Sequence, residues 1–180
     1  MTTNVSIRKI AFAGAVAALY AAMTIALSVT GYGPIQFRVA EVLCILPFFF
    51  PFSVWGLFTG CIIANLLSPY FLDIVVGPMA SLIAGTLTML IGKADRNNVM
   101  VKALACIPPV VVNAVFIGAM IAYYMTGAGE STTFFAAFML CGAQVGIGQF
   151  AVLYALGLPL MIFLPKSRVY NKLLEYYEGG

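Results

Sequence analysis

The sequence predicts an all-α integral membrane protein with six transmembrane helices and both termini in the cytoplasm. Of its 180 residues, 63% are hydrophobic and only 8% are charged, whereas a typical soluble domain is about one quarter charged. Long apolar runs alternate with short turn-rich segments, and the chain has room for about six spans of about 20 residues each. We therefore expect a single transmembrane domain over residues 1–180 that crosses the plasma membrane several times.

Each expected span follows from an apolar run and from the turn residues that end it. The first run, of about 20 residues, is longer than the core of a signal peptide (about 7–15 residues), so we expect it to remain as a span. Gly33 and Pro34 break the helix after it. Pro47 and Pro51 predict a kink and then a tight turn between two short spans, and Pro159 predicts a bend in the last span. The expected spans are residues 10–29, 38–50, 53–67, 73–92, 101–125 and 132–164.

The distribution of basic residues predicts the topology. Eight of the nine basic residues form three groups, at the start, the middle and the end of the chain: Arg8, Lys9, Lys93, Arg96, Lys102, Lys166, Arg168 and Lys172. An even number of spans puts both ends and the central loop on one side, and basic loops stay in the cytoplasm. Because no basic face stands apart from these loops, nucleic acid is not an expected partner. The tail predicts an interfacial helix whose apolar side carries Tyr170, Leu173, Leu174 and Tyr177.

Small residues recur at every fourth position in two of the expected spans, a spacing that lets another helix approach closely. In the third span, the series Gly56, Gly60 and Ala64 predicts packing within the bundle. The first span carries alanine or glycine over most of its circumference, more than one internal neighbour needs. The first span therefore has two alternative interpretations, an external helical partner and packing within the bundle.

The sequence argues against an enzyme. The chain has no histidine, and its four cysteines lie far apart in apolar runs, at Cys44, Cys61, Cys106 and Cys141. We interpret them as small packing residues rather than as metal ligands or disulfides. No Walker phosphate loop is present, so the chain is not expected to hydrolyse ATP. The segment GIGQFA, which begins at Gly146, resembles a dinucleotide fingerprint, but it lies inside an apolar span with no preceding strand, and we reject that interpretation. We expect no metal and no cofactor.

Polar residues from several spans are expected to converge near the outer rim of the bundle. They are Arg38 and Glu41 at the start of the second span, Asn65 at the end of the third, Asp73 at the start of the fourth and, deeper, Asn113 and Gln144. Polar groups are costly in lipid, so these residues are candidates for a substrate site that opens outward. Carboxylates and amides suit the edge of a planar heterocycle such as a purine. Candidate stacking partners are Tyr32, Phe37, Tyr70, Tyr123 and Tyr124.

Structural roles compete with this interpretation. Arg38 and Glu41 have the i, i+3 spacing of an ion pair at a helix end. Asp73 stands where an N-cap of the fourth span would stand. Asn113 and Gln144 are each able to form an interhelical hydrogen bond. The sequence leaves these alternatives open.

The segments GPIQFRVAEVLCILPFFFPFSVWGLFTGCIIANLLSP (residues 33–69) and DIVVGPMASLIAGTLTMLIG (residues 73–92) resemble the QueT family of queuosine-precursor transporters. The family belongs to the substrate-binding S components of energy-coupling factor (ECF) transporters. The resemblance implies an S-component-like bundle of six helices and a 7-deazaguanine ligand. It also implies a partner module that consists of a transmembrane coupling protein and two ATPases. An alanine-rich face of the first helix would dock the coupling protein, and of Ala11/Ala15, Ala13/Ala17 and Ala18/Ala22 we select Ala13 and Ala17.

The resemblance also implies roles for the polar residues. Glu41 is expected to accept the N1–H and the exocyclic amine of the base, and Asn65 or Gln144 to read its carbonyl edge. Asp73 is expected to pair with the ammonium of an aminomethyl substituent, and Arg38 to keep Glu41 ionised. Two alternative functions are an S component for another vitamin or heterocycle and an autonomous secondary transporter. The latter would need an ion-coupling acid at mid-depth, which the sequence does not predict.

Overall fold

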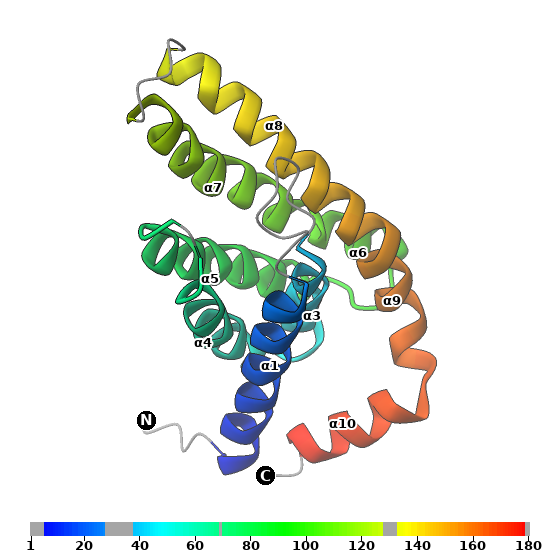
Figure 1. Cartoon of the computed structure of the whole chain (residues 1–180). Helices are drawn as coiled ribbons and strands as arrows, with labels where there is room; N and C mark the ends of the chain where they lie inside the picture. Colours follow the sequence, from blue (N-terminus) through cyan, green and yellow to red (C-terminus); the bar gives the residue numbers. More distant parts are fainter. Residues whose placement is uncertain (1–5, 28–37, 69, 128–132, 179–180) are drawn as a thin grey trace, which may run out of the picture.

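The computed structural model describes residues 6–27, 38–68, 70–127 and 133–178. Within these ranges every regular element is helical (Figure 1). The first half contains α1 (Ile7–Ala26), the 3₁₀ helix η1 (Val39–Ile45), α3 (Leu46–Phe49), α4 (Ser53–Asn65) and α5 (Asp73–Ile91). The second half contains α6 (Val99–Ala105), α7 (Ile107–Gly127), α8 (Phe134–Val152), the π-helical turn η2 (Leu153–Gly157), α9 (Leu158–Phe163), the 3₁₀ turn η3 (Leu164–Lys166) and α10 (Arg168–Glu178).

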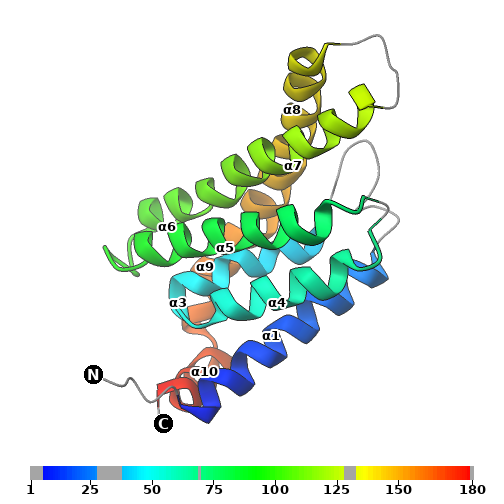
Figure 2. The same cartoon turned by 90° about the vertical axis from the view of Figure 1, so that its left-hand side faces the viewer.

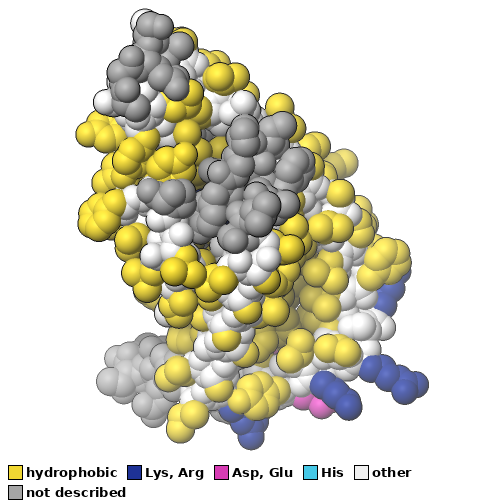
Figure 3. Space-filling model, viewed as in Figure 1, with side chains coloured by type: hydrophobic (Ala, Val, Ile, Leu, Met, Phe, Trp, Pro, Cys, Tyr) yellow, Lys and Arg dark blue, Asp and Glu magenta, His cyan; other side chains and the backbone are white. Residues whose placement is uncertain are grey.

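Within the described residues, four helical segments are long and apolar enough to cross a membrane: Ile7–Ala26, Asp73–Ile91, Val99–Gly127 and Phe134–Lys166. Two further apolar segments are shorter, Val39–Phe49 and Ser53–Asn65, as the sequence predicted. At about 1.5 Å per residue, α4 rises about 20 Å, less than the roughly 30 Å of a bilayer's hydrocarbon core. Hydrophobic side chains cover most of the face seen in Figure 3. The all-α, multi-pass membrane architecture is therefore confirmed.

The start of α1 and the end of α10 lie side by side. The start of α1, the end of α10 and the turn between α5 and α6 lie at one end of the bundle (Figure 2). The last turns of α1, α4 and α7 lie at the other end. On the face seen in Figure 3, Lys and Arg side chains gather at the end where α1 begins and α10 ends. This arrangement is the one that the charge pattern predicts, and the assignment of this end to the cytoplasm stays a prediction.

The α1 and α4 helices pack in close contact because α4 carries glycine where the two helices meet. A Cβ atom on Gly56 would lie 2.5 Å from the carbonyl oxygen of Ala13, and one on Gly60 would lie 2.7 Å from that of Ala17. The interpretation of the glycine series in α4 as packing within the bundle is therefore confirmed. Ala13 and Ala17 are only 7% and 6% exposed. The pair selected for partner docking thus lies against α4, and its docking role stays untested.

The C-terminal helix α10 folds back onto the first half of the chain (Figure 1). The ring of Tyr177 lies 5.5 Å from that of Phe12 and 5.3 Å from that of Phe50, centroid to centroid. Its hydroxyl oxygen accepts a hydrogen bond from the backbone N–H of Phe52 at 3.0 Å. The apolar side of this helix was predicted with the correct residues, but it packs on the protein core and not only on lipid.

Candidate binding site

The carboxylate of Glu41 accepts hydrogen bonds from four neutral donors. The Tyr20 hydroxyl donates to Oε1 at 2.6 Å. Three groups converge on Oε2: the thiol of Cys44 at 3.0 Å, the amide Nε2 of Gln149 at 3.2 Å and the amide Nδ2 of Asn113 at 3.4 Å. Glu41 is 2% exposed, and its partners come from α1, η1, α7 and α8. Such a set of donors suits an ionised carboxylate, which only accepts hydrogen bonds.

The local fold of η1 explains how this carboxylate is presented. In a 3₁₀ helix, side chains three residues apart lie one above the other. Glu41 and Cys44 have this spacing, so both point to the same side of η1. Arg38 has the same spacing from Glu41 but stands at the N-cap of η1, with φ −83° and ψ 88°, outside the helix. Its side chain therefore reaches a different partner.

That partner is Asp73, the first residue of α5. Arg38 Nη2 lies 2.9 Å from Asp73 Oδ2, which also accepts from the Ser68 hydroxyl at 3.0 Å. Asn65 Nδ2 donates to the backbone carbonyl of Asp73 at 2.8 Å. Asp73 is fully buried, and within the described ranges its Oδ1 has no hydrogen-bond partner. The ion pair thus crosses between segments, and Arg38 does not form with Glu41 the ion pair that the i, i+3 spacing predicts.

Gly77 leaves space for this cluster one turn further along α5. A Cβ atom there would overlap Asn65 Nδ2 and lie 2.9 Å from Asp73 Oδ1. The N-cap alternative for Asp73 is wrong, because Leu72 is the N-cap of α5 and Asp73 is the first residue of the helix. Asn65 and Asp73 therefore lie together, as the sequence predicted, in a buried polar layer.

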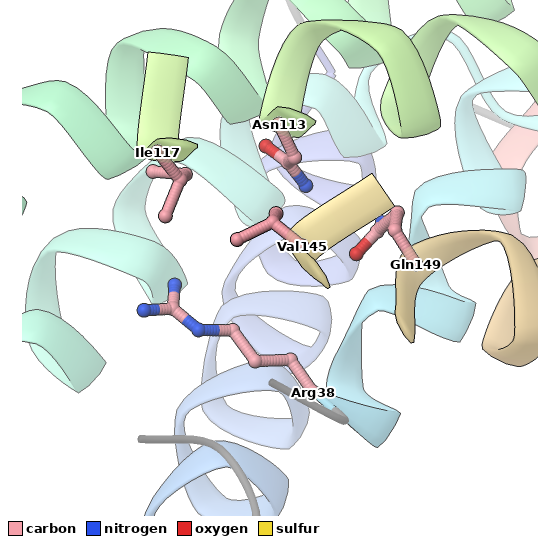
Figure 4. A pocket seen from close by; sticks show the side chains of 5 residues that line it. All are labelled: Arg38, Asn113, Ile117, Val145 and Gln149. Atoms are coloured by element: carbon pink, nitrogen blue, oxygen red, sulfur yellow. The ribbon is translucent and has the colours of Figure 1, made fainter. Parts of the chain in front are cut away.

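A small cavity lies beside the two clusters. It is lined by Arg38, Asn113, Ile117, Val145 and Gln149 (Figure 4). Asn113 and Gln149 point toward each other from α7 and α8 (Figure 4). The side chain of Arg38 lies across Val145 from Asn113, with its guanidinium on the side of Ile117. The cavity measures about 10 Å³, which is room for roughly one water molecule. A bicyclic ligand fits only if the α7–α8 walls move away from η1.

Aromatic residues flank the apolar wall of this cavity. Tyr70 and Tyr124 pack on the buried cluster that contains Ile117 and Val145, and their ring centroids are 5.1 Å apart. Two of the predicted stacking residues are therefore near the cavity. Tyr123 is 61% exposed, and the two others, Tyr32 and Phe37, lie outside the described residues.

The structure brings most of the predicted polar residues into two adjacent groups. Glu41 and Asn113 belong to the first, and the second contains Arg38, Asn65 and Asp73. Gln144 belongs to neither group: its side chain is half-buried, and the glutamine that reaches Glu41 is Gln149.

The sequence did not identify three donors to Glu41: Gln149, Tyr20 and Cys44, which was interpreted as a packing residue. Gln149 lies in the GIGQF segment, one residue after Gly148 on the buried face of α8. The series of small and apolar residues at helical spacing on that face was the signal that could have found it. Tyr20 is the only tyrosine in the alanine-rich helix α1, and its depth in the membrane gave no reason to select it.

A buried carboxylate and a buried ion pair, enclosed by apolar helices that cross a membrane, define a class of protein: a membrane transport protein with an internal polar site. The chain belongs to the QueT transporter family, whose model matches residues 10–166. Over 78 residues it is 41% identical to the queuosine precursor transporter QueT of Lactococcus lactis subsp. cremoris. The aligned part is 42% of this chain and 46% of that relative, so it spans less than half of either. No significant match to a solved structure was found.

Proposed function

We propose that this chain is the substrate-binding subunit of an energy-coupling factor importer and that it takes up queuosine precursors of the 7-deazaguanine type. The observation that carries the proposal is the carboxylate of Glu41, which receives four neutral donors beside a cavity. The family and the name of the Lactococcus relative support the same substrate class.

The donor pattern of the base matches this site. A 7-deazaguanine carries its N1–H and its exocyclic amine side by side, and one carboxylate accepts both. When Glu41 turns to these two donors, the amides of Asn113 and Gln149 become available. An amide offers one donor and one acceptor, which suits the carbonyl oxygen and the remaining ring edge. Ile117 and Val145 then contact the faces of the rings.

The balance of charge favours a cationic ligand. Among the described residues of this site, two buried acids, Glu41 and Asp73, face a single buried arginine, Arg38. With all three ionised the group carries one net negative charge, which a monocation neutralises. Asp73 Oδ1 is an acceptor that lacks a partner within the described ranges. An aminomethyl substituent supplies the required ammonium, and a cyano substituent does not.

We therefore expect the purified chain in detergent to bind 7-aminomethyl-7-deazaguanine more tightly than 7-cyano-7-deazaguanine. A hydrogen bond to a charged group contributes about 1.5–3 kcal/mol, so the preference is expected to be about 10- to 150-fold in Kd. Calorimetric titration with both compounds, guanine and riboflavin measures it. Binding of riboflavin or another vitamin in place of the deazaguanines would support a different S component and overturn the proposed substrate.

The proposed energy source is a partner module with a transmembrane coupling protein and two ATPases. This fits a sequence without a Walker loop. Because Ala13 and Ala17 face α4, the proposed docking face lies on the opposite side of α1. Its exposed small residues are Ala11, Ala15, Ala18 and Ala22. Small residues at this spacing let a partner helix approach the backbone closely.

Leucine at Ala15 or Ala18 is expected to reduce uptake in cells at least about tenfold, because a bulky side chain keeps a partner helix from close approach. Ligand binding by the isolated variants is expected to stay unchanged. Ala143→Leu, on the exposed side of α8, makes the same change away from this face and is the matched control. Normal uptake by both α1 variants would place docking elsewhere. Sustained uptake by the chain alone in proteoliposomes would instead support a secondary transporter.

A further inference from the structure

Tyr20 connects the binding site with the first helix. Its hydroxyl forms the shortest of the four hydrogen bonds to Glu41, at 2.6 Å, and its side chain is 1% exposed. The thiol sulfur of Cys61, on α4, lies 3.8 Å from the same hydroxyl oxygen. The phenol therefore stands between two acceptors, one inside the binding site and one on the neighbouring helix.

A ligand that donates to Glu41 competes with Tyr20. Oε2 of Glu41 already receives three protein donors, and Oε1 receives Tyr20 alone. A ligand edge with two parallel N–H groups bonds to both oxygens of one carboxylate, so Glu41 must turn toward it, and Oε1 then moves away from the Tyr20 hydroxyl. A buried hydroxyl without an acceptor is costly, so a displaced Tyr20 hydroxyl needs another partner. Cys61 Sγ is already near enough to become that partner.

Movement of the phenol acts directly on the contact between α1 and α4. A Cβ atom on Gly60 would lie 3.0 Å from the Cβ atom of Tyr20. Because Gly60 has no side chain, Tyr20 packs against the backbone of α4. No flexible side chain therefore lies between them to accommodate a displacement of Tyr20. Close-packed interfaces of this kind transmit small displacements.

We propose that ligand binding transfers the Tyr20 hydroxyl from Glu41 toward Cys61 and thereby changes the packing of α1 against α4. This inference rests on the proposed function, because it requires a ligand that donates to Glu41. Tyr20 is then the residue that positions α1 according to the occupancy of the site. The opposite side of α1 is the exposed small-residue face that includes Ala15 and Ala18.

The single tryptophan of the chain, Trp55, reports on this contact. It is 52% exposed and lines a groove between α1 and α4 together with Ala13, Gly14 and Ala17. Its fluorescence emission depends on that local environment. Saturating 7-aminomethyl-7-deazaguanine is therefore expected to shift the Trp55 emission of the full, detergent-solubilised wild-type chain.

Tyr20→Phe removes the hydroxyl and keeps the ring in the core. The variant is expected to bind the same compound with a Kd lowered severalfold, because a competitor for Glu41 is gone. The Trp55 shift is expected to disappear. Tyr154→Phe is the matched control, since its hydroxyl donates to the backbone carbonyl of Ala103 at 2.9 Å, and it should keep the full shift.

Each outcome is decisive. A full Trp55 shift in Tyr20→Phe overturns the inference and leaves the proposed ligand intact. A tenfold or greater loss of affinity also overturns it, because Tyr20 would then orient Glu41 for the ligand instead of competing with it. Absence of binding by the wild-type chain overturns the proposed ligand and this inference together. If Tyr20→Phe does not fold, Cys61→Ala provides the test, because it removes the second acceptor of the Tyr20 hydroxyl. A Kd raised severalfold together with loss of the Trp55 shift supports the inference. An unchanged Kd and an unchanged Trp55 shift overturn it.

Discussion

Glu41→Gln is expected to weaken the binding of 7-aminomethyl-7-deazaguanine by at least about 100-fold. A carboxylate accepts both N–H groups of the base edge, whereas a carboxamide accepts at one atom and donates at the other. Two hydrogen bonds to a charged group are worth about 3–6 kcal/mol together, or roughly 100- to 10,000-fold in Kd. Calorimetric titration of the purified variant measures the loss.

The fold is expected to survive this substitution. Asn113 and Gln149 can each turn the oxygen of their amide toward the new NH₂ group, so the hydrogen bonds around position 41 re-form. Glu175→Gln on the exposed side of α10 makes the same chemical change far from the cavity and is the matched control. Thermal unfolding of all three proteins in detergent separates a binding defect from a folding defect. Unchanged affinity in a folded Glu41→Gln variant would remove Glu41 from the binding site.

The helical segments were predictable because lipid offers the backbone no hydrogen-bond partner except itself. An apolar run between turn residues must therefore become a helix, and its length shows whether it crosses the membrane. The expected span at residues 73–92 and the helix Asp73–Ile91 agree within one residue. Hydropathy has no term for the type of helix, so the 3₁₀ geometry of η1, which places Cys44 beside Glu41, could not be anticipated.

Depth in the membrane can be counted along a sequence, but rotation about a helix axis is harder to assign. Asn113 and Gln144 were both expected to be deep, and only Asn113 reaches Glu41. Gln149 is five residues from Gln144, which is a turn of about 140° around the axis at about 100° per residue. Membrane helices are apolar nearly all round, so the sequence gives only a weak signal for the side that faces the protein.

The partner of Arg38 was mispredicted for a related reason. The i, i+3 spacing to Glu41 predicts a contact only if both residues belong to the helix. Arg38 is the N-cap, and its backbone leaves the helical conformation there. Its guanidinium therefore reaches across to α5, where Asp73 is fully buried. A contact between segments 35 residues apart in sequence is decided by packing, which local spacing does not contain.

Asp73→Asn is expected to destabilise the folded chain severely. It removes the carboxylate that neutralises the buried guanidinium of Arg38. Removal of one partner of a buried ion pair costs about 3–5 kcal/mol. For a chain of this size, such a loss lowers Tm by about 6–20 °C. Thermal unfolding in detergent measures it, and a Tm within about 2 °C of wild type would show that Arg38 does not depend on Asp73.

The double variant Arg38→Met/Asp73→Leu separates stability from recognition. Replacing both partners of a buried pair with apolar residues of similar volume is often neutral or stabilising, so the Tm of the double variant is expected to recover most of the loss. If the pair serves only the fold, the double variant keeps the wild-type preference for the aminomethyl compound. If Asp73 also receives the ligand ammonium, the fold recovers while 7-aminomethyl- and 7-cyano-7-deazaguanine bind equally. That second result would show that the Arg38–Asp73 pair is required for ligand selectivity and not for stability.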